Sequence, residues 1–171
     1  EKDQEHLPQV LFSIPELISD RTEYILGEVK TNPAYSIAKI LLMMESIGVR
    51  LAAMACNSAH APQIFNVILS ELNENYSGIK LLHMIKEVGL FIRDHYEVSK
   101  KVGIMGTTGT YYTRQYDLIN ESGLSTVYLT EPEQKNLHSA IYHPLFGIKA
   151  NAGRIPAETV KILEESITSL I

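Results

Sequence analysis

The stretch VRLAAMACNSAH, residues 49–60, joins a continuous apolar run to a group of small polar residues. Residues 49–55 are apolar except for Arg50, which predicts a strand covered on both faces, as in a parallel sheet. Residues 62–72 then repeat apolar side chains with the period of a helix. A buried strand that leads through a short turn into a helix is the repeating unit of α/β folds. We therefore predict an α/β fold with a mainly parallel sheet.

The same alternation continues on both sides of this segment. Upstream, the pattern predicts a strand over residues 8–14, a loop over 15–22, and a helix over 33–47 that ends at Gly48. Downstream, strands are predicted at residues 80–82, 102–106 and 126–129, and helices at residues 85–96, 111–121, 133–142 and 156–170. The pattern around Cys56 starts again near Val102, which predicts a second lobe.

Composition and charge argue against several classes of function. The net charge is −5 without a basic stripe, which argues against a nucleic-acid partner. No apolar run reaches membrane-spanning length, and the first residues are too polar for a secretory signal, so we expect no membrane association. Cys56 is the one cysteine, and a lone thiol fits a reducing cytoplasm. The six histidines lack metal-ligand spacing, so no metal site is expected.

Cys56, Asn57 and Ser58 lie where the buried strand is expected to give way to a helix. Ligands of open α/β sheets bind beyond the carboxyl ends of the strands. The N–H groups of a helix start stabilise a thiolate, which can take a proton from carbon, while Asn57 and Ser58 could donate hydrogen bonds to a carboxylate. The alternative is that Cys56 is a small buried hydrophobe and that the two polar residues cap the helix. The spacing alone favours neither interpretation.

A second turn, Gly106-Thr107-Thr108-Gly109-Thr110, also follows an apolar strand and precedes a helix. Its N–H groups and hydroxyls suit an anion, although its spacing is neither that of a Walker loop nor Gly-x-Gly-x-x-Gly. Taken alone, it is better explained as a glycine turn with a threonine cap. Arg21 and Lys149 are cations that could bind a carboxylate, Arg21 bidentately, but a solvated surface charge is the default for each.

The order of these segments along the chain resembles the aspartate/glutamate racemase family. The similarity runs through nearly the whole sequence, and the motif around Cys56 is its most specific part. The matching segments are Asp3-Gln4-Glu5-His6, Ser19-Asp20-Arg21-Thr22, Cys56-Asn57-Ser58-Ala59-His60, Gly106-Thr107-Thr108-Gly109-Thr110, and Ala140-Ile141-Tyr142 with Gly147-Ile148-Lys149.

This resemblance implies two similar three-layer lobes, here residues 1–98 and 99–171, with mainly parallel sheets and the active site in the cleft between them. Members usually form homodimers and use no cofactor: neither pyridoxal phosphate, nor nicotinamide, nor a metal. Two cysteines on opposite faces of the α-carbon remove and return a proton, and Cys56 corresponds to the first. The resemblance assigns the α-carboxylate of a dicarboxylic amino acid to Asn57, Ser58, Thr108, Gly109 and Thr110, and its distal carboxylate to Arg21 and Lys149.

The sequence departs from the family in two places. The second cysteine, in a Gly-Cys-Thr-Glu motif, and the opening strand with its glycine-rich turn have no counterpart. We expect a chain cut at both ends, so that the first lobe lacks its opening strand and the second its final strands. The alternative is a dicarboxylate-binding remnant without racemisation. Maleate isomerases and malonate-type decarboxylases of the wider superfamily also use a strand-end cysteine, but not the Arg21 and Lys149 segments in this arrangement.

Overall fold

The computed structural model describes residues 2–96, 100–151 and 153–171. Within these ranges the strands form two separate sheets, each with two parallel strands. In one sheet β1 (Leu51–Ala53) pairs with β2 (Lys80–Leu82), and in the other β3 (Lys101–Ile104) pairs with β4 (Ser125–Tyr128). Helices separate successive strands along the chain, which confirms the predicted α/β class with parallel strands.

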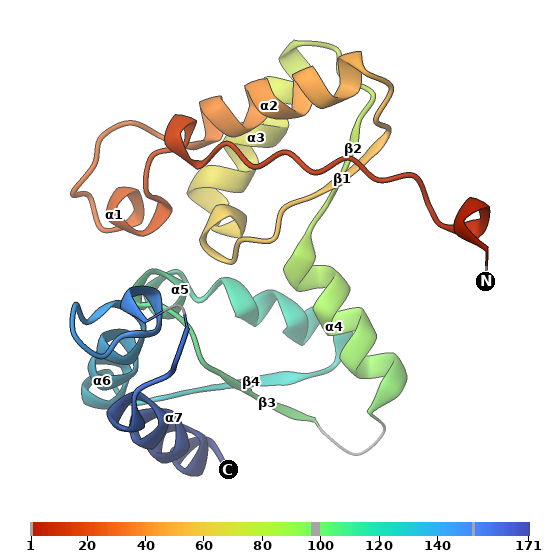
Figure 1. Cartoon of the computed structure of the whole chain (residues 1–171). Coiled ribbons are helices and arrows are strands. Elements are labelled where there is room, and N and C mark those ends of the chain that lie inside the picture. The colour runs from red at the N-terminus through yellow and green to blue at the C-terminus, as the bar shows by residue number, and fades with distance from the viewer. Residues whose placement is uncertain (1, 97–99, 152) are drawn as a thin grey trace.

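The first sheet belongs to a β1–β2 unit with two helices, α2 (Ala34–Ser46) and α3 (Pro62–Glu74), which pack against each other (Figure 1). Asn32 Oδ1 accepts a hydrogen bond from the Ala34 N–H at 2.9 Å, which caps the start of α2. Gly48 ends that helix with a φ of 96°, as predicted. The core of the unit combines one face of each helix with the sheet: Ala34, Ile37, Ala38, Leu41, Ala52, Ala59, Ile64, Ile68, Leu72 and Ile79.

The second sheet belongs to a β3–β4 unit. It contains α4 (Met84–His95), α5 (Thr108–Thr113), the 3-10 segment η4 (Gln115–Ser122), α6 (Glu131–Tyr142) and α7 (Ala157–Leu170). α4 precedes β3 in the chain, yet Ile85 of α4 is buried in this core with Ile119 and Leu124. A Cβ at Gly89 would lie 3.1 Å from the Ile119 side chain, so a larger residue would force Ile119 to shift, and glycine suits the close approach of α4 to η4. The predicted lobe boundary, between residues 98 and 99, lies outside the described residues.

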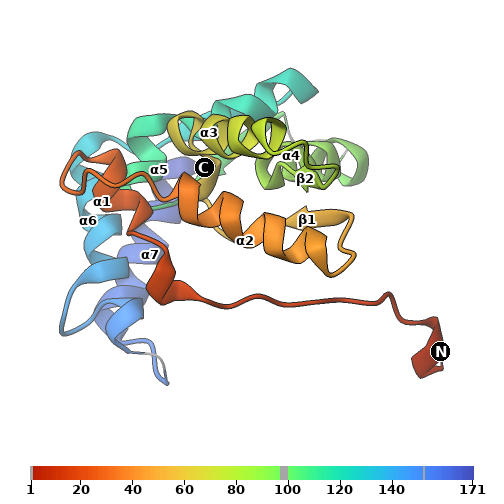
Figure 2. The ribbon, with the colours of Figure 1, turned by 90° about the horizontal axis from the view of Figure 1, so that it is seen from above.

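The predicted strand over residues 8–14 is wrong. These residues have no regular secondary structure, and they run as an extended segment along the outside of the molecule (Figure 2). Val10 and Leu11 are 50% and 90% exposed. A strand needs a neighbour that accepts and donates its backbone hydrogen bonds, and the described partner of β1 is β2. Residues 8–14 have the apolar pattern of a strand, but they pair with no neighbouring strand among the described residues.

The coverage predicted for the strand before Cys56 is also wrong. β1 buries Ala52, whereas Leu51 is 55% exposed and Ala53 is exposed as well. Alternate side chains of a strand point to opposite faces, so one face of β1 contacts the core and the other is open. Among the described residues, β1 is therefore buried on one face only, despite its continuous apolar sequence.

The single helix predicted over residues 111–121 is interrupted. α5 ends at Thr113, Arg114 has left-handed backbone geometry with a φ of 48°, and η4 follows. Gly123 ends η4 with a φ of 81°, as predicted for the end of this helix. The predicted loop over residues 15–22 contains a 3-10 turn, η2 (Pro15–Leu17), and the first residues of α1 (Arg21–Ile25). Two further 3-10 turns are η1 (Asp3–Glu5) and η5 (Ile148–Ala150).

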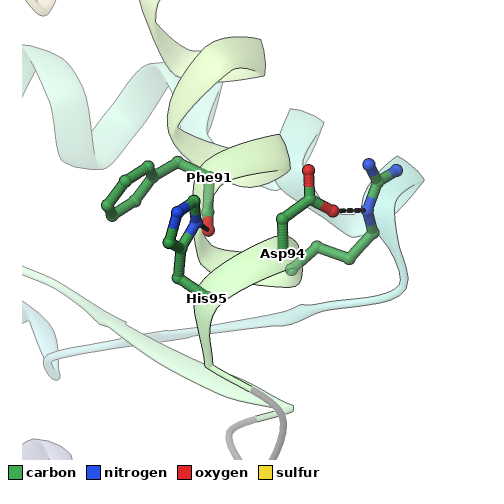
Figure 3. A network of polar contacts seen from close by, with 4 residues as sticks. Phe91, Asp94 and His95 are labelled. Carbon is green, nitrogen blue, oxygen red and sulfur yellow. Dashed lines mark hydrogen bonds and ion pairs between the residues drawn. The ribbon is translucent and has the colours of Figure 1, made fainter.

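The outer end of α4 carries a group of exposed polar contacts (Figure 3). Arg93 Nε donates a hydrogen bond to Asp94 Oδ1 at 2.7 Å, which lowers the pKa of the Asp94 carboxyl. The His95 ring stacks on Phe91, and its Nδ1 lies 2.9 Å from the Phe91 carbonyl oxygen. These contacts finish the last turn of the helix on the surface. None of the described helices combines the length and apolar content needed to cross a lipid bilayer.

Candidate functional site

Arg21 is placed by the cap of α1. The Asp20 carboxylate accepts hydrogen bonds from the N–H groups of Thr22 at 2.7 Å and Glu23 at 3.0 Å, which starts the helix at Arg21. The Arg21 side chain is half-buried. No hydrogen bond or ion pair of its guanidinium is found among the described residues, so it is a cation available to a ligand.

Cys56 and Arg21 line the same cavity. Its volume is about 460 Å³, and it lies at the end of β1, between the N-terminal segment and α2. Ser13 is a third polar residue of its wall. The remaining lining is apolar and comes from Val10, Leu11, Phe12, Ile14, Pro15, Ile18, Ile37, Ile40, Leu41, Met44, Ala53, Met54, Ala55 and Ala59. A half-buried thiol and a half-buried guanidinium thus share one largely apolar wall.

The helix predicted over residues 62–72 is confirmed as α3, but it does not follow Cys56 directly. A 3-10 turn, η3 (Ser58–His60), follows the cysteine, and α3 begins only at Pro62. The fully buried His60 ring holds this turn: its Nε2 accepts the Met84 N–H at 3.2 Å, so its Nδ1 carries the proton and donates to the Cys56 carbonyl oxygen at 2.8 Å. Burial lowers the pKa of His60, which keeps the ring neutral. Ser58 is buried, so its hydroxyl is not freely exposed.

We expect the neighbouring His83 to make the stability of the fold depend on pH. Burial, followed by the nearby His60 and Lys86, lowers its pKa from 6.5 to about 4. Its buried Nδ1 has no hydrogen-bond partner among the described residues. Unfolding lets this ring take up a proton below pH 6.5, so we expect the free energy of unfolding to fall as the pH drops from 6.5 towards 4. For this half-buried group the loss at pH 5 should be up to about 1 kcal/mol.

Urea unfolding at pH 7 and pH 5 tests this expectation. His83→Phe keeps the ring contact with Phe65, which lies 4.5 Å away between centroids, and removes the titrating nitrogen. The variant should therefore gain stability relative to the parent at pH 5 more than at pH 7. His6→Gln, on the exposed N-terminal segment, is the control. An equal difference at both pH values would exclude His83 as the source.

The second predicted turn packs against α1. Thr107 Oγ1 accepts the Thr110 N–H at 3.4 Å and caps α5. Gly109 faces Thr22, where a Cβ would lie 3.4 Å from the threonine methyl. The first turn of α5, which holds Thr108, Gly109 and Thr110, therefore lies beside the helix that begins with Arg21 (Figure 1). These three residues do not line the cavity of Cys56.

Two aromatic side chains, His138 and Tyr142, link Thr108 to Lys149. The Thr108 N–H donates to His138 Nδ1 at 3.2 Å, and the His138 ring stacks on Tyr142 at 4.8 Å between centroids. Lys149 Nζ lies 4.0 Å from the centroid of the same Tyr142 ring. Burial, and then the charge of Lys149, lower the pKa of His138. The half-buried His138 ring therefore caps the start of α5. Lys149 itself is exposed and outside the cavity.

Asn57 has two contacts that the sequence did not indicate. Gln115 Nε2 donates to the Asn57 carbonyl oxygen at 2.6 Å, and the Tyr116 hydroxyl donates to Asn57 Oδ1 at 2.7 Å. Neither residue belongs to a recognisable motif, and they are 58 and 59 positions from Asn57 along the chain. In the described part of the chain, no group of three His, Cys, Asp or Glu side chains could hold a metal ion.

Comparison with known proteins gives matches among solved structures. No protein-family model matches the sequence, and no curated protein does. The structure matches the aspartate racemase of Picrophilus torridus with a TM-score of 0.75 and 24% sequence identity. A protein from Yersinia pestis assigned to the Asp/Glu racemases matches with a TM-score of 0.66 and 17% identity. The chain has the fold of these racemases.

These matches cover most of this chain but a smaller share of each solved protein. The first covers 99% of this chain but 66% of the Picrophilus protein, and the second covers 87% of this chain but 60% of the Yersinia protein. The predicted resemblance to the racemase family is therefore confirmed in the fold. Of the predicted site residues, Cys56 and Arg21 line one cavity, and Asn57 and Ser58 follow Cys56 directly in the chain. The others belong to the neighbouring β3–β4 unit: Thr108, Gly109, Thr110 and Lys149.

Proposed function

We propose that the chain belongs to the aspartate/glutamate racemase family and that Cys56 takes the α-proton from a dicarboxylic amino acid without a cofactor. The proposal rests on one observation above the others: Cys56 and Arg21, 35 positions apart in the numbering, line one cavity in a chain with a racemase fold. A thiolate supplies the base, and a guanidinium supplies a bidentate partner for the distal carboxylate. The β1–β2 and β3–β4 units would be the two lobes of such an enzyme, with the substrate in the cleft between them.

The remaining site residues have roles that follow from charge. Proton removal leaves a carbanion whose negative charge spreads onto the α-carboxylate, and pre-placed donors stabilise that charge. Asn57 and Ser58 after β1, together with the Thr108-Gly109-Thr110 turn, would supply these donors. Lys149, which is linked to Thr108 through Tyr142 and His138, would join Arg21 in binding the distal carboxylate. We further propose a homodimer in the cytoplasm that acts on free amino acids and has no nucleic-acid partner.

Inversion of the α-carbon needs a proton donor on the face opposite Cys56. A single base removes the proton and returns it mostly to the same face, so it exchanges the proton without producing the D-isomer. Cys56 is the one cysteine of the 171 residues. This observation favours a second candidate function, in which these residues bind a dicarboxylate and exchange its α-proton but do not racemise it.

The first experiment measures α-proton exchange in deuterated water with L-aspartate and L-glutamate. We expect deuterium at Cα of one or both acids, because Cys56 needs no second base to exchange a proton. L-Asparagine is the matched control, since it lacks only the distal charge. Accumulation of D-isomer would support full racemisation, and exchange with retention would support the second candidate. No exchange with either acid would contradict the proposal that Cys56 is an α-proton base.

A further inference from the structure

Arg114 interrupts the helix between α5 and η4, where the two units meet. Its left-handed backbone, with a φ of 48°, turns the chain between α5 and η4. Such a conformation is unfavourable for arginine, but the guanidinium carbon lies 3.9 Å from the Tyr128 ring centroid and 4.6 Å from that of Tyr111. The Arg114 side chain is thus held against two tyrosine rings where the backbone turns. As a result, Gln115 and Tyr116 leave the helix line and reach Asn57 of the β1–β2 unit.

Gln115 fixes the backbone of Asn57. The glutamine is 5% exposed, so its amide has exchanged water for protein partners. Its Nε2 donates to the Asn57 carbonyl oxygen at 2.6 Å, and its Oε1 lies 3.4 Å from Thr113 Oγ1. The same carbonyl also accepts the His60 N–H at 3.0 Å. Both lone pairs of this oxygen are therefore occupied, and the peptide after Asn57 is held from two units.

Tyr116 fixes the side chain of Asn57. Its hydroxyl donates to Asn57 Oδ1 at 2.7 Å. Burial raises the pKa of Tyr116, so the phenol stays protonated and remains a donor. The contact of Oδ1 with Tyr116 orients the Asn57 amide and leaves its NH₂ group, which offers donors alone, to face a ligand. No partner of this NH₂ group is found among the described residues.

We propose that Gln115 and Tyr116 are positioning residues that hold Asn57 with its amide NH₂ free to bind the carboxylate of the amino acid. This inference rests on the proposed function for the identity of the ligand. It assigns to the β3–β4 unit a direct part in shaping the turn that follows Cys56 in the other unit. We name the two hydrogen bonds from Gln115 and Tyr116 to Asn57 the Asn57 clamp.

The test uses alkylation of Cys56, which is unambiguous because the chain has one cysteine. Iodoacetamide labelling is followed by mass spectrometry at increasing L-aspartate, and the half-protecting concentration measures binding. Tyr116→Phe keeps the ring but loses one hydrogen bond, so the half-protecting concentration should rise by roughly 3- to 10-fold. Tyr112→Phe is the matched control, because Tyr112 is 54% exposed on α5 and the hydrogen bonds described for Asn57 come from Gln115, Tyr116 and His60.

A double-mutant cycle separates positioning from general stability. If Tyr116 acts through Asn57, Tyr116→Phe should change the half-protecting concentration less than about 2-fold in an Asn57→Ala background. An undiminished effect there would overturn the proposal, as would equal effects of Tyr116→Phe and Tyr112→Phe. Gln115→Met should also weaken protection. Gln134→Met controls for its loss of stability, since Gln134 is equally buried and donates to the Gly106 carbonyl oxygen at 2.9 Å.

Failure of the proposed function remains distinguishable from failure of the clamp. If neither L-aspartate nor L-glutamate protects Cys56 in the parent, the ligand is wrong, and amide hydrogen exchange then decides the clamp. Gln115→Met should accelerate exchange of the His60 amide, which donates to the clamped carbonyl. Gln134→Met should leave that amide unchanged. Unchanged exchange at His60 in Gln115→Met would overturn the clamp on structural grounds alone.

Discussion

Replacing Cys56 with alanine should abolish most of the α-proton exchange of the amino acid that the protein binds. A positioned general base contributes roughly 10²- to 10⁴-fold to such a proton transfer, and we expect the exchange rate to fall by that factor. Cys56 is half-buried and lines the same cavity as Arg21, and no other cysteine could take its place. Deuterium incorporation at Cα, followed by proton NMR, measures the loss.

Two controls distinguish loss of the base from loss of the fold. Cys56→Ser keeps the shape of the side chain but replaces the thiol with a hydroxyl, which is a far weaker acid, so exchange should fall almost as far as in Cys56→Ala. Urea unfolding of both variants should resemble that of the parent, because the side chain is small and only half-buried. Exchange that persists in both variants would identify a different base and would remove Cys56 from the chemistry.

Elements with local signals were predictable from the sequence. The strand Lys80–Leu82 was predicted to the residue. The helices that start near Pro33 and Pro62 carry an apolar stripe, which is visible in the local sequence without knowledge of what packs against it. Glycines at positive φ, such as Gly48 and Gly123, end helices where predicted because only glycine adopts that backbone freely. These features depend on a few adjacent residues, and the sequence contains all of them.

Elements that depend on distant partners were not predictable. Residues 8–14 have the composition of a strand, but a strand is defined by hydrogen bonds to a neighbour, and the sequence does not show which neighbours exist. The break at Arg114 is similar, because its left-handed backbone is accompanied by contacts of the guanidinium with the Tyr111 and Tyr128 rings. Tyr128 belongs to β4, so the sequence around Arg114 could not reveal this contact.

The candidate site divides along the same line. The order of the Asp-Arg-Thr and Cys-Asn-Ser-Ala-His segments pointed to Arg21 and Cys56, and the structure brings both into one cavity wall. The residues that contact Asn57 and Thr108 from other parts of the chain carry no motif in the sequence. Gln115 and Tyr116 reach Asn57 from the other unit, and His138 joins Thr108 to the Tyr142 ring. Their roles come from contacts between segments far apart in the chain.

Replacing Arg21 with lysine should weaken the binding of L-aspartate although the charge is preserved. Arginine presents two parallel N–H donors to a carboxylate, whereas lysine offers a single compact charge. Hydrogen bonds to charged groups contribute about 1.5–3 kcal/mol, so we expect the half-protecting concentration of L-aspartate in Cys56 alkylation to rise by roughly 10- to 100-fold. Arg50→Lys, at an exposed arginine just before β1, is the matched control and should change little.

The specificity of this effect identifies which end of the amino acid Arg21 contacts. L-Asparagine has the same α-carboxylate as L-aspartate but carries an amide in place of the distal carboxylate. If Arg21 binds the distal carboxylate, Arg21→Lys should weaken aspartate strongly and leave the weaker binding of asparagine almost unchanged. Equal losses for both would move Arg21 to the α-carboxylate. Unchanged protection by aspartate would mean that this half-buried guanidinium, although it lines the wall beside Cys56, does not bind the substrate.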